Sequence, residues 1–149
     1  MHVFGWDPKL GLGIFTIMKT IEVVAGVIRD SAGRVFCVQR GENAKKYISK
    51  KWEFPGGKLE PGESREEALV RELKEELKVL VSNLEFLTTV DYTYPDFRLV
   101  MHAFTCEVRG SKNPELTEHL AYEWRESSDL KNLDWAAADV PIVEVLMDR

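Results

Sequence analysis

The positions of apolar residues along the chain predict a central helix between two groups of strands. Leu69, Leu73 and Leu77 recur every four residues, which places one apolar stripe along a helix. This helix begins after Ser64, which forms a capping box with Glu67. Runs rich in β-branched and aromatic residues predict strands before and after the helix, at residues 21–28, 34–40, 84–90, 97–108 and 120–124.

A second helix is predicted over residues 139–146, near the C-terminus. Strands on both sides of one helix, followed by a last helix, indicate an α/β fold with a mixed sheet between helices. A chain of 149 residues is long enough for one such domain with a full core. Because a strand follows Met18 directly, we expect an N-terminal extension at 1–17 and the domain at 18–149.

The composition and charge exclude several classes of protein. The net charge of −5 argues against a nucleic-acid polymer as partner, which would require a basic face. The apolar run at 10–17 is too short to cross a membrane, and no secretory signal pattern precedes it. Two cysteines, Cys37 and Cys106, form no disulfide framework and are interpreted as reduced core residues. We therefore expect a cytoplasmic protein, either a monomer or a homodimer.

The chemistry is concentrated in a glycine-rich loop and the helix that follows it. Gly56 and Gly57 open the loop, and Glu72, Glu75 and Glu76 follow at i, i+3 and i+4 on one face of the helix. A solvated acidic face is one interpretation of these three carboxylates. The other is a metal site, because Mg²⁺ takes carboxylate and backbone carbonyl oxygens and shares them with substrate phosphates.

The spacing of these residues resembles the Nudix box, Gly-x5-Glu-x7-Arg-Glu-U-x-Glu-Glu-x-Gly-U, where U is aliphatic. The matching positions are Gly57, Glu63, Arg71, Glu72, Leu73, Glu75, Glu76 and Val79. One position departs, because Lys78 stands where the box has a helix-ending glycine. The resemblance implies the Nudix α/β/α sandwich with a mixed β-sheet.

The resemblance also implies a cofactor and a set of site residues. The cofactor is Mg²⁺, with Mn²⁺ as an alternative. Glu72 is favoured as the general base, and Arg71 is expected to orient Glu75 by a charge-assisted hydrogen bond. The implied metal ligands are the Gly56 carbonyl, Glu72, Glu75, Glu76 and, by a looser alignment, Glu118.

Substrate contacts are expected on both sides of the box. The segment 136–141 resembles the part that recognises the base in MutT-type and CTP-pyrophosphohydrolase-type members, and Asp139 is its only acidic residue. A helix N-cap is the alternative role for Asp139. Trp135, Tyr94 and Phe104 are candidates for a ring that stacks on the base, with a place in the core as the alternative for each. Arg40, beside a basic loop, is interpreted as a contact to phosphates, with a solvated loop as the alternative.

The leading hypothesis is Mg²⁺-dependent hydrolysis of a nucleoside triphosphate to a monophosphate and pyrophosphate. Oxidised or cytosine nucleotides, such as 8-oxo-dGTP, CTP and dCTP, are the favoured substrates. One alternative is a hydrolase of another nucleoside diphosphate derivative. The other is a nucleotide-binding module that has the fold without the reaction.

Overall fold

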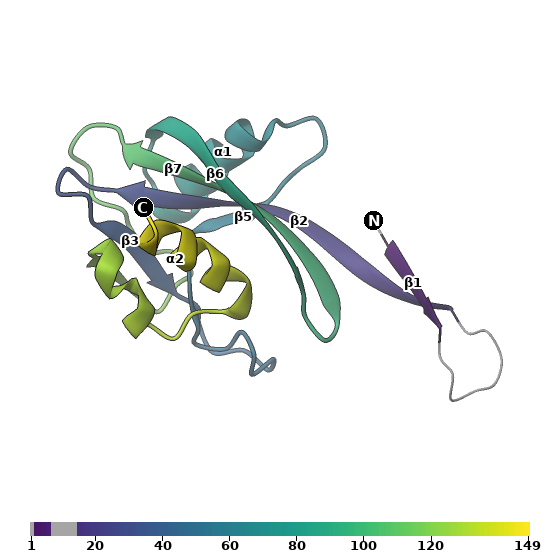
Figure 1. Ribbon diagram of the computed structural model, residues 1–149. Coiled ribbons are helices and arrows are strands. Elements are labelled where there is room, and N and C mark those ends of the chain that lie inside the picture. The colour runs from purple at the N-terminus through teal and green to yellow at the C-terminus, as the bar shows by residue number, and fades with distance from the viewer. Residues whose placement is uncertain (1, 7–14) are drawn as a thin grey trace.

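The computed structural model describes residues 2–6 and 15–149 (Figure 1). The predicted extension at 1–17 therefore lies partly outside the described residues. The strands are β1 (His2–Trp6), β2 (Phe15–Arg29), β3 (Val35–Gln39), β4 (Trp52–Glu53), β5 (Gly56–Lys58), β6 (Val81–Thr93), β7 (Phe97–Val108) and β8 (Ala121–Arg125). The helices are α1 (Arg65–Leu77) and α2 (Val140–Met147), with short 3₁₀ helices η2 (Ser127–Asn132) and η3 (Ala137–Asp139).

In this part of the chain the strands form one eight-stranded mixed sheet with the central order β4-β3-β2-β7-β6. β1 and β5 also pair with β2, and β8 pairs with β3. The central strands β2 and β7 run parallel, from Lys19 opposite Phe97 to Arg29 opposite Glu107. The first part of β2 pairs with β1 and extends beyond the other strands (Figure 1). The sheet is thus mixed, as predicted.

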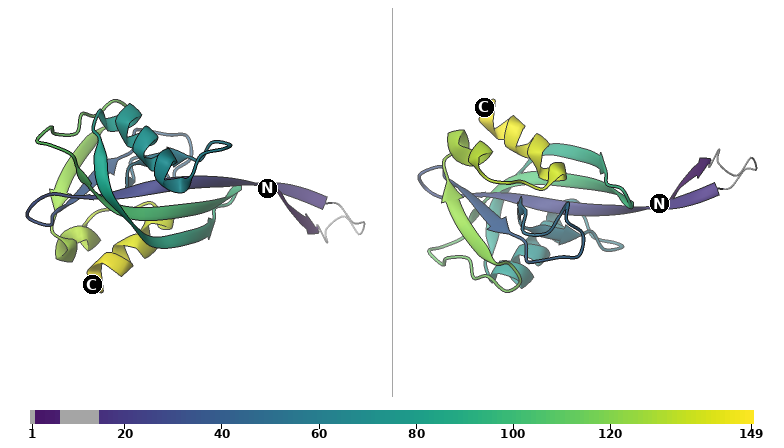
Figure 2. Two further views of the ribbon diagram at one scale, coloured as in Figure 1. Left: turned by 90° about the horizontal axis from the view of Figure 1, so that it is seen from above. Right: turned by 90° about the horizontal axis from the view of Figure 1, so that it is seen from below.

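The two helices cover opposite faces of this sheet (Figure 2). The predicted stripe of Leu69, Leu73 and Leu77 is completely buried and shares a core with Val24 and Ile28 of β2. On the other face, α2 packs in a second core whose members include Ala25, Val27, Ile142, Val143 and Leu146. The predicted α/β/α sandwich is confirmed.

Local expectations are confirmed where short-range signals determine the structure. Ser64 Oγ accepts a hydrogen bond from the backbone N–H of Glu67 at 3.1 Å, and the Glu67 carboxylate accepts one from the N–H of Ser64 at 2.9 Å. Cys37 and Cys106 are buried free thiols, and burial raises the pKa of each to about 12.

Strand lengths differ from the predictions because pairing continues beyond the apolar runs. β6 covers Val81–Thr93 rather than 84–90, since it pairs with β7 along nearly its whole length, with two irregularities in register. Similarly, the loop predicted from Gly56 begins as a strand, β5, which pairs with β2. Its apolar content is low, so the pattern of hydrophobic positions contains no sign of it.

Lys78 ends α1 in the left-handed conformation, with φ 58° and ψ 33°, and its backbone N–H donates to the carbonyl of Lys74. This is the position where the Nudix box has glycine. A non-glycine residue in this conformation costs roughly 1–2 kcal/mol. The helix therefore ends as the box predicts, and the lysine carries conformational strain.

Replacing Lys78 by glycine is expected to raise the free energy of unfolding by about 1 kcal/mol, because glycine adopts this conformation without a steric cost. The larger entropy of the unfolded glycine variant offsets part of the gain. Urea unfolding of both proteins measures the difference. Lys74→Gly, one turn earlier in the helix interior, is the control and should lower stability by about 1 kcal/mol. A Lys78→Gly protein that is less stable than the original contradicts the prediction.

Candidate active site

The glycine pair of β5 lies between β2 and α1 with no room for side chains. Gly56 and Gly57 pair with Ala25 and Val24. A Cβ atom on Gly56 would lie 1.9 Å from the Val24 carbonyl oxygen, and one on Gly57 would lie 2.3 Å from the Glu72 carboxylate. The carboxylate of Glu72 is therefore packed directly on the bare backbone of Gly57.

Arg71 holds the carboxylates around it in place. Its guanidinium donates two hydrogen bonds to Glu63, at 2.7 and 2.8 Å, and one to the Lys58 carbonyl at 3.1 Å. Its Nη1 donates to Glu72 at 3.0 Å and to Glu75 at 3.4 Å. The hydrogen bonds from Arg71 lower the pKa of Glu63 to about 2. One arginine thus links the loop to two of the three carboxylates that the box places on the helix.

Glu76 is the least compensated of these carboxylates. Its Oε2 is buried without a hydrogen-bond partner. Burial, opposed by His119 and reinforced by Glu118, Glu72 and Glu53, raises its pKa to about 7. Burial also raises the pKa of Glu72, opposed by Arg71. A buried carboxylate among other carboxylates is costly unless a cation compensates it, so the orphaned oxygen fits a bound metal ion.

The side chains are not arranged as a complete metal cage. Within residues 18–149, no three His, Cys, Asp or Glu side chains are close enough together to hold a metal ion by themselves. Glu72 and Glu75 are turned toward Arg71 instead. A set of ligands that includes a backbone carbonyl and substrate oxygens agrees with this arrangement, because Mg²⁺ commonly completes its coordination with water and phosphate.

Beside the carboxylates lies a cavity of about 630 Å³. Four of the predicted site residues line it, namely Gly56, Glu76, Arg40 and Asp139. Its wall also contains apolar and aromatic side chains from the sheet and from the loops, including Ile21, Val23, Phe54, Tyr94 and Met101. A polar end with an apolar wall is suited to a ligand with phosphates and a flat ring.

Asp139 is buried in this cavity, with 6% of its surface exposed. It stands at the N-cap position of α2 but makes no capping hydrogen bond. Instead its Oδ1 accepts a hydrogen bond from the backbone N–H of Phe54 at 3.0 Å. Burial, reinforced by nearby Glu53, raises the pKa of Asp139 well above its ordinary value. In its protonated form the group both donates and accepts.

Trp135, the predicted stacking residue, does not line the cavity. Its ring is buried and stacks on Phe54, with 4.6 Å between the ring centroids, and its Nε1 donates to the Leu130 carbonyl at 2.6 Å. Of these two stacked rings, Phe54 lines the cavity and Trp135 packs against Phe54. The position of Phe54 two residues before the glycine pair is the only signal in the sequence that could have indicated this.

Sequence reasoning also missed Glu53 and His119. Glu53 lies between Arg40, whose Nε is 3.2 Å from one carboxylate oxygen, and His119, whose Nε2 is 3.2 Å from the other. These three side chains come from separate parts of the chain and meet only through the pairing of β3 with β4 and β8. Arg40 is therefore already paired with a carboxylate beside the cavity.

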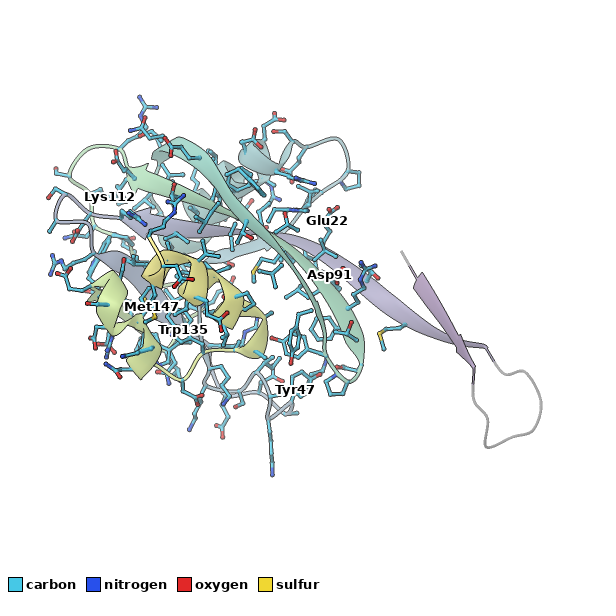
Figure 3. The ribbon with its side chains drawn as sticks, viewed as in Figure 1. Glu22, Tyr47, Asp91, Lys112, Trp135 and Met147 are labelled. Carbon is cyan, nitrogen blue, oxygen red and sulfur yellow. The ribbon has the colours of Figure 1, made fainter. Side chains whose placement is uncertain are left out.

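The loop after β3 is attached to the turn between β6 and β7. Lys45 forms an ion pair with Asp96 at 2.6 Å, and the Tyr47 hydroxyl donates to the same carboxylate. Tyr47 also stacks on Tyr94, and the Lys45 ammonium lies over the Phe97 ring. Figure 3 shows Tyr47 beside this turn. Because Lys45, Asp96, Tyr94 and Phe97 line the cavity, this attachment forms one of its walls.

Comparison with known protein families matches residues 19–146 to the NUDIX domain. The chain belongs to the Nudix family. The match covers the box, the residues that line the cavity, α1 and all of α2 except Met147.

This Nudix hydrolase has named relatives of similar length. It is 31% identical over 129 residues to an 8-oxo-dGTP diphosphatase of Escherichia coli (strain K12), covering 87% of this chain and 98% of the relative. It is 34% identical over 131 residues to the CTP pyrophosphohydrolase of the same organism, covering 87% and 93%. The solution structure of the E. coli ORF135 protein matches with a TM-score of 0.73 at 33% identity, over 88% of this chain and 91% of that one.

These relatives confirm that the protein is a hydrolase with the Nudix fold. Among the described residues, no helix of the Nudix hydrolase is long and apolar enough to cross a membrane.

Proposed function

We propose that this Nudix hydrolase cleaves nucleoside triphosphates to a monophosphate and pyrophosphate with Mg²⁺, and Mn²⁺ as an alternative metal. The observation that carries the proposal is the orphaned carboxylate oxygen of Glu76 in the wall of the cavity that also contains buried Asp139. The first fits a cation, and the second offers a buried carboxyl group for a hydrogen bond to a base. A nucleotide with its metal provides both. Relatives named for 8-oxo-dGTP and CTP support the same substrate class.

The residues that would hold the metal come from β5, from α1 and from the segment before β8. They are the Gly56 carbonyl, Glu72, Glu75, Glu76 and Glu118, and Glu118 acts electrostatically on both Glu72 and Glu76. A bound Mg²⁺ supplies neutralisation of the phosphate charge and activates water. Without it, these carboxylates would repel the substrate.

Glu72 is the proposed acceptor of a proton from the attacking water. Arg71 occupies its Oε1 at 3.0 Å, and the backbone of Gly57 restricts its position. Only 14% of its side chain is exposed, and burial raises its pKa toward the range useful for a base. Arg71 is a positioning residue, because it contacts Glu72 and Glu75 rather than the cavity.

A pyrophosphate-release assay tests the reaction. Purified protein should release pyrophosphate from a nucleoside triphosphate with Mg²⁺ present and lose this activity when EDTA is added. Tight nucleotide binding without turnover would indicate the binding module instead. Release of orthophosphate alone would contradict cleavage to a monophosphate and pyrophosphate.

We further propose that Asp139 contacts the base. A carboxylate accepts a hydrogen bond from the amino group of cytosine, and its protonated form pairs with a base edge that offers a donor and an acceptor, such as that of an oxidised guanine. Uracil and thymine present a carbonyl where cytosine has its amino group. An ionised Asp139 therefore favours CTP and dCTP over UTP and dTTP, whereas a protonated Asp139 fits 8-oxo-dGTP.

Replacing Asp139 by alanine is expected to reduce the preference for CTP over UTP by about tenfold, because an unpaired buried group costs about 1–3 kcal/mol. The measurement is kcat/KM for CTP, UTP, dTTP and 8-oxo-dGTP with both proteins. Asp148→Ala, at an exposed carboxylate near the C-terminus, serves as the control. If the Asp139 variant keeps the original ranking of substrates, the role of the Asp139 carboxylate in the original protein is limited to its hydrogen bond with Phe54.

A further inference from the structure

Glu72, Glu75 and Glu76, which we call the acidic cluster, contribute Glu75 to a second concave surface. It has a volume of about 700 Å³ and contains four cationic side chains, Lys74, Lys78, Arg109 and Lys112, which we call the cationic pocket. Lys74 and Lys78 come from the end of α1, and the other two follow the end of β7, where Lys112 is labelled in Figure 3. The Arg109 backbone N–H donates to the Leu80 carbonyl at 2.8 Å and joins the two segments.

None of these four cations has an ion-pair partner among the described residues. The other charged groups of the pocket wall are Arg71 and Glu75, which pair with each other. The concentration of positive charge is notable in a chain with a net charge of −5. Lys74 and Lys78 are also one helical turn apart, a spacing at which like charges repel. The pocket is therefore poised to accept an anion of several charges.

Lys78 adds an independent observation. Its left-handed conformation has an appreciable steric cost, which glycine would remove. Glycine at this position would end the helix equally well, so the fold does not require a lysine here. What the lysine adds is an ammonium group at the edge of the pocket.

The acidic cluster separates the cationic pocket from the substrate cavity. Glu75 lines the pocket and Glu76 lines the cavity, although they are consecutive on α1. Their side chains point about 100° apart around the helix axis. A phosphate chain that crosses the carboxylates from the cavity would therefore reach the lysines of α1.

We propose that the cationic pocket binds a diphosphate group. The negative charge of pyrophosphate is nearly equal in size to the positive charge of the four cations. The group could come from free pyrophosphate or from the distal phosphates of a bound nucleotide. Assignment to one of these sources rests on the proposed function, whereas binding of the inorganic anion does not.

The primary test is calorimetric titration of the whole protein with sodium pyrophosphate at low ionic strength in EDTA. Without metal, the carboxylates of the candidate active site repel the anion, so the signal reports the cationic pocket. Lys78→Gly should weaken binding by about fivefold, the effect of one ion pair near 1 kcal/mol. K74Q/K112Q should weaken it further.

Lys50→Gly is the matched control. Lys50 is exposed, is also left-handed with φ 59°, and lies outside the cationic pocket. The control removes the same charge and the same strain, so its pyrophosphate affinity should equal that of the original protein. The proposal is overturned if the original protein does not bind metal-free pyrophosphate, or if Lys50→Gly weakens binding as much as Lys78→Gly.

Steady-state kinetics with Mg²⁺ then identifies the source of the diphosphate. If distal phosphates of the nucleotide enter the pocket, Lys78→Gly raises KM and Lys50→Gly does not. If only released pyrophosphate enters, KM is unchanged and inhibition by added pyrophosphate weakens in Lys78→Gly alone. An enzyme that releases no pyrophosphate would refute the proposed function while leaving the calorimetric result intact.

Discussion

Replacing Glu75 by glutamine is expected to lower kcat/KM by about a hundredfold or more, because several kcal/mol of stabilisation from the metal would be lost. The fold should be unaffected. The Glu75 side chain is 62% exposed, and it accepts a hydrogen bond from Arg71 at 3.4 Å. The effect should therefore appear in the pyrophosphate-release assay and not in thermal unfolding.

Glu66→Gln is the matched control for this experiment. Glu66 is an exposed carboxylate in the first turn of the same helix, outside the cavity and the acidic cluster. It should retain full activity. Activity of the Glu75 variant within a few-fold of the original would remove Glu75 from the site. A large fall in both variants would point to a general effect of charge on the helix.

Replacing Gly57 by alanine is expected to lower kcat by about a hundredfold, because displacing a catalytic group by about 1 Å has an effect of this size. The added Cβ would lie 2.3 Å from the Glu72 carboxylate and force it to move. Gly57 is not in a left-handed conformation, so the backbone itself accepts alanine. Gly41→Ala is the control, since nothing lies within 4 Å of a Cβ atom at Gly41.

A double-mutant cycle separates this mechanism from a general disturbance of β5. If alanine acts by moving Glu72, the Gly57→Ala penalty should shrink strongly in a Glu72→Gln background, because the two changes affect one interaction. The measurement is kcat for the four proteins of the cycle. Equal penalties in both backgrounds would show that Gly57 acts independently of Glu72.

Features that depend on short separations along the chain can be predicted from the sequence alone. The capping box at Ser64 and the leucine stripe of α1 follow from local hydrogen bonds and helical periodicity. The spacing of Glu72, Glu75 and Glu76 places them on one helix regardless of the surroundings. The strand predicted at 97–108 has the observed bounds of β7, because its apolar residues alternate along the whole segment. The same segment pairs with β6 over nearly all of its length.

The side chains that share a cavity, and the pKa that each carboxylate has there, follow from the tertiary structure. The sequence predicts either a helix cap or a base contact for Asp139. In the structure its carboxylate accepts a hydrogen bond from the backbone N–H of Phe54, 85 residues away, instead of capping the helix. Glu53 and His119 meet because separate strands pair with β3. Burial and long-range contacts set the pKa of a carboxylate and the solvation of a lysine. Neither property follows from residue type and spacing, because both depend on groups that are distant in the chain.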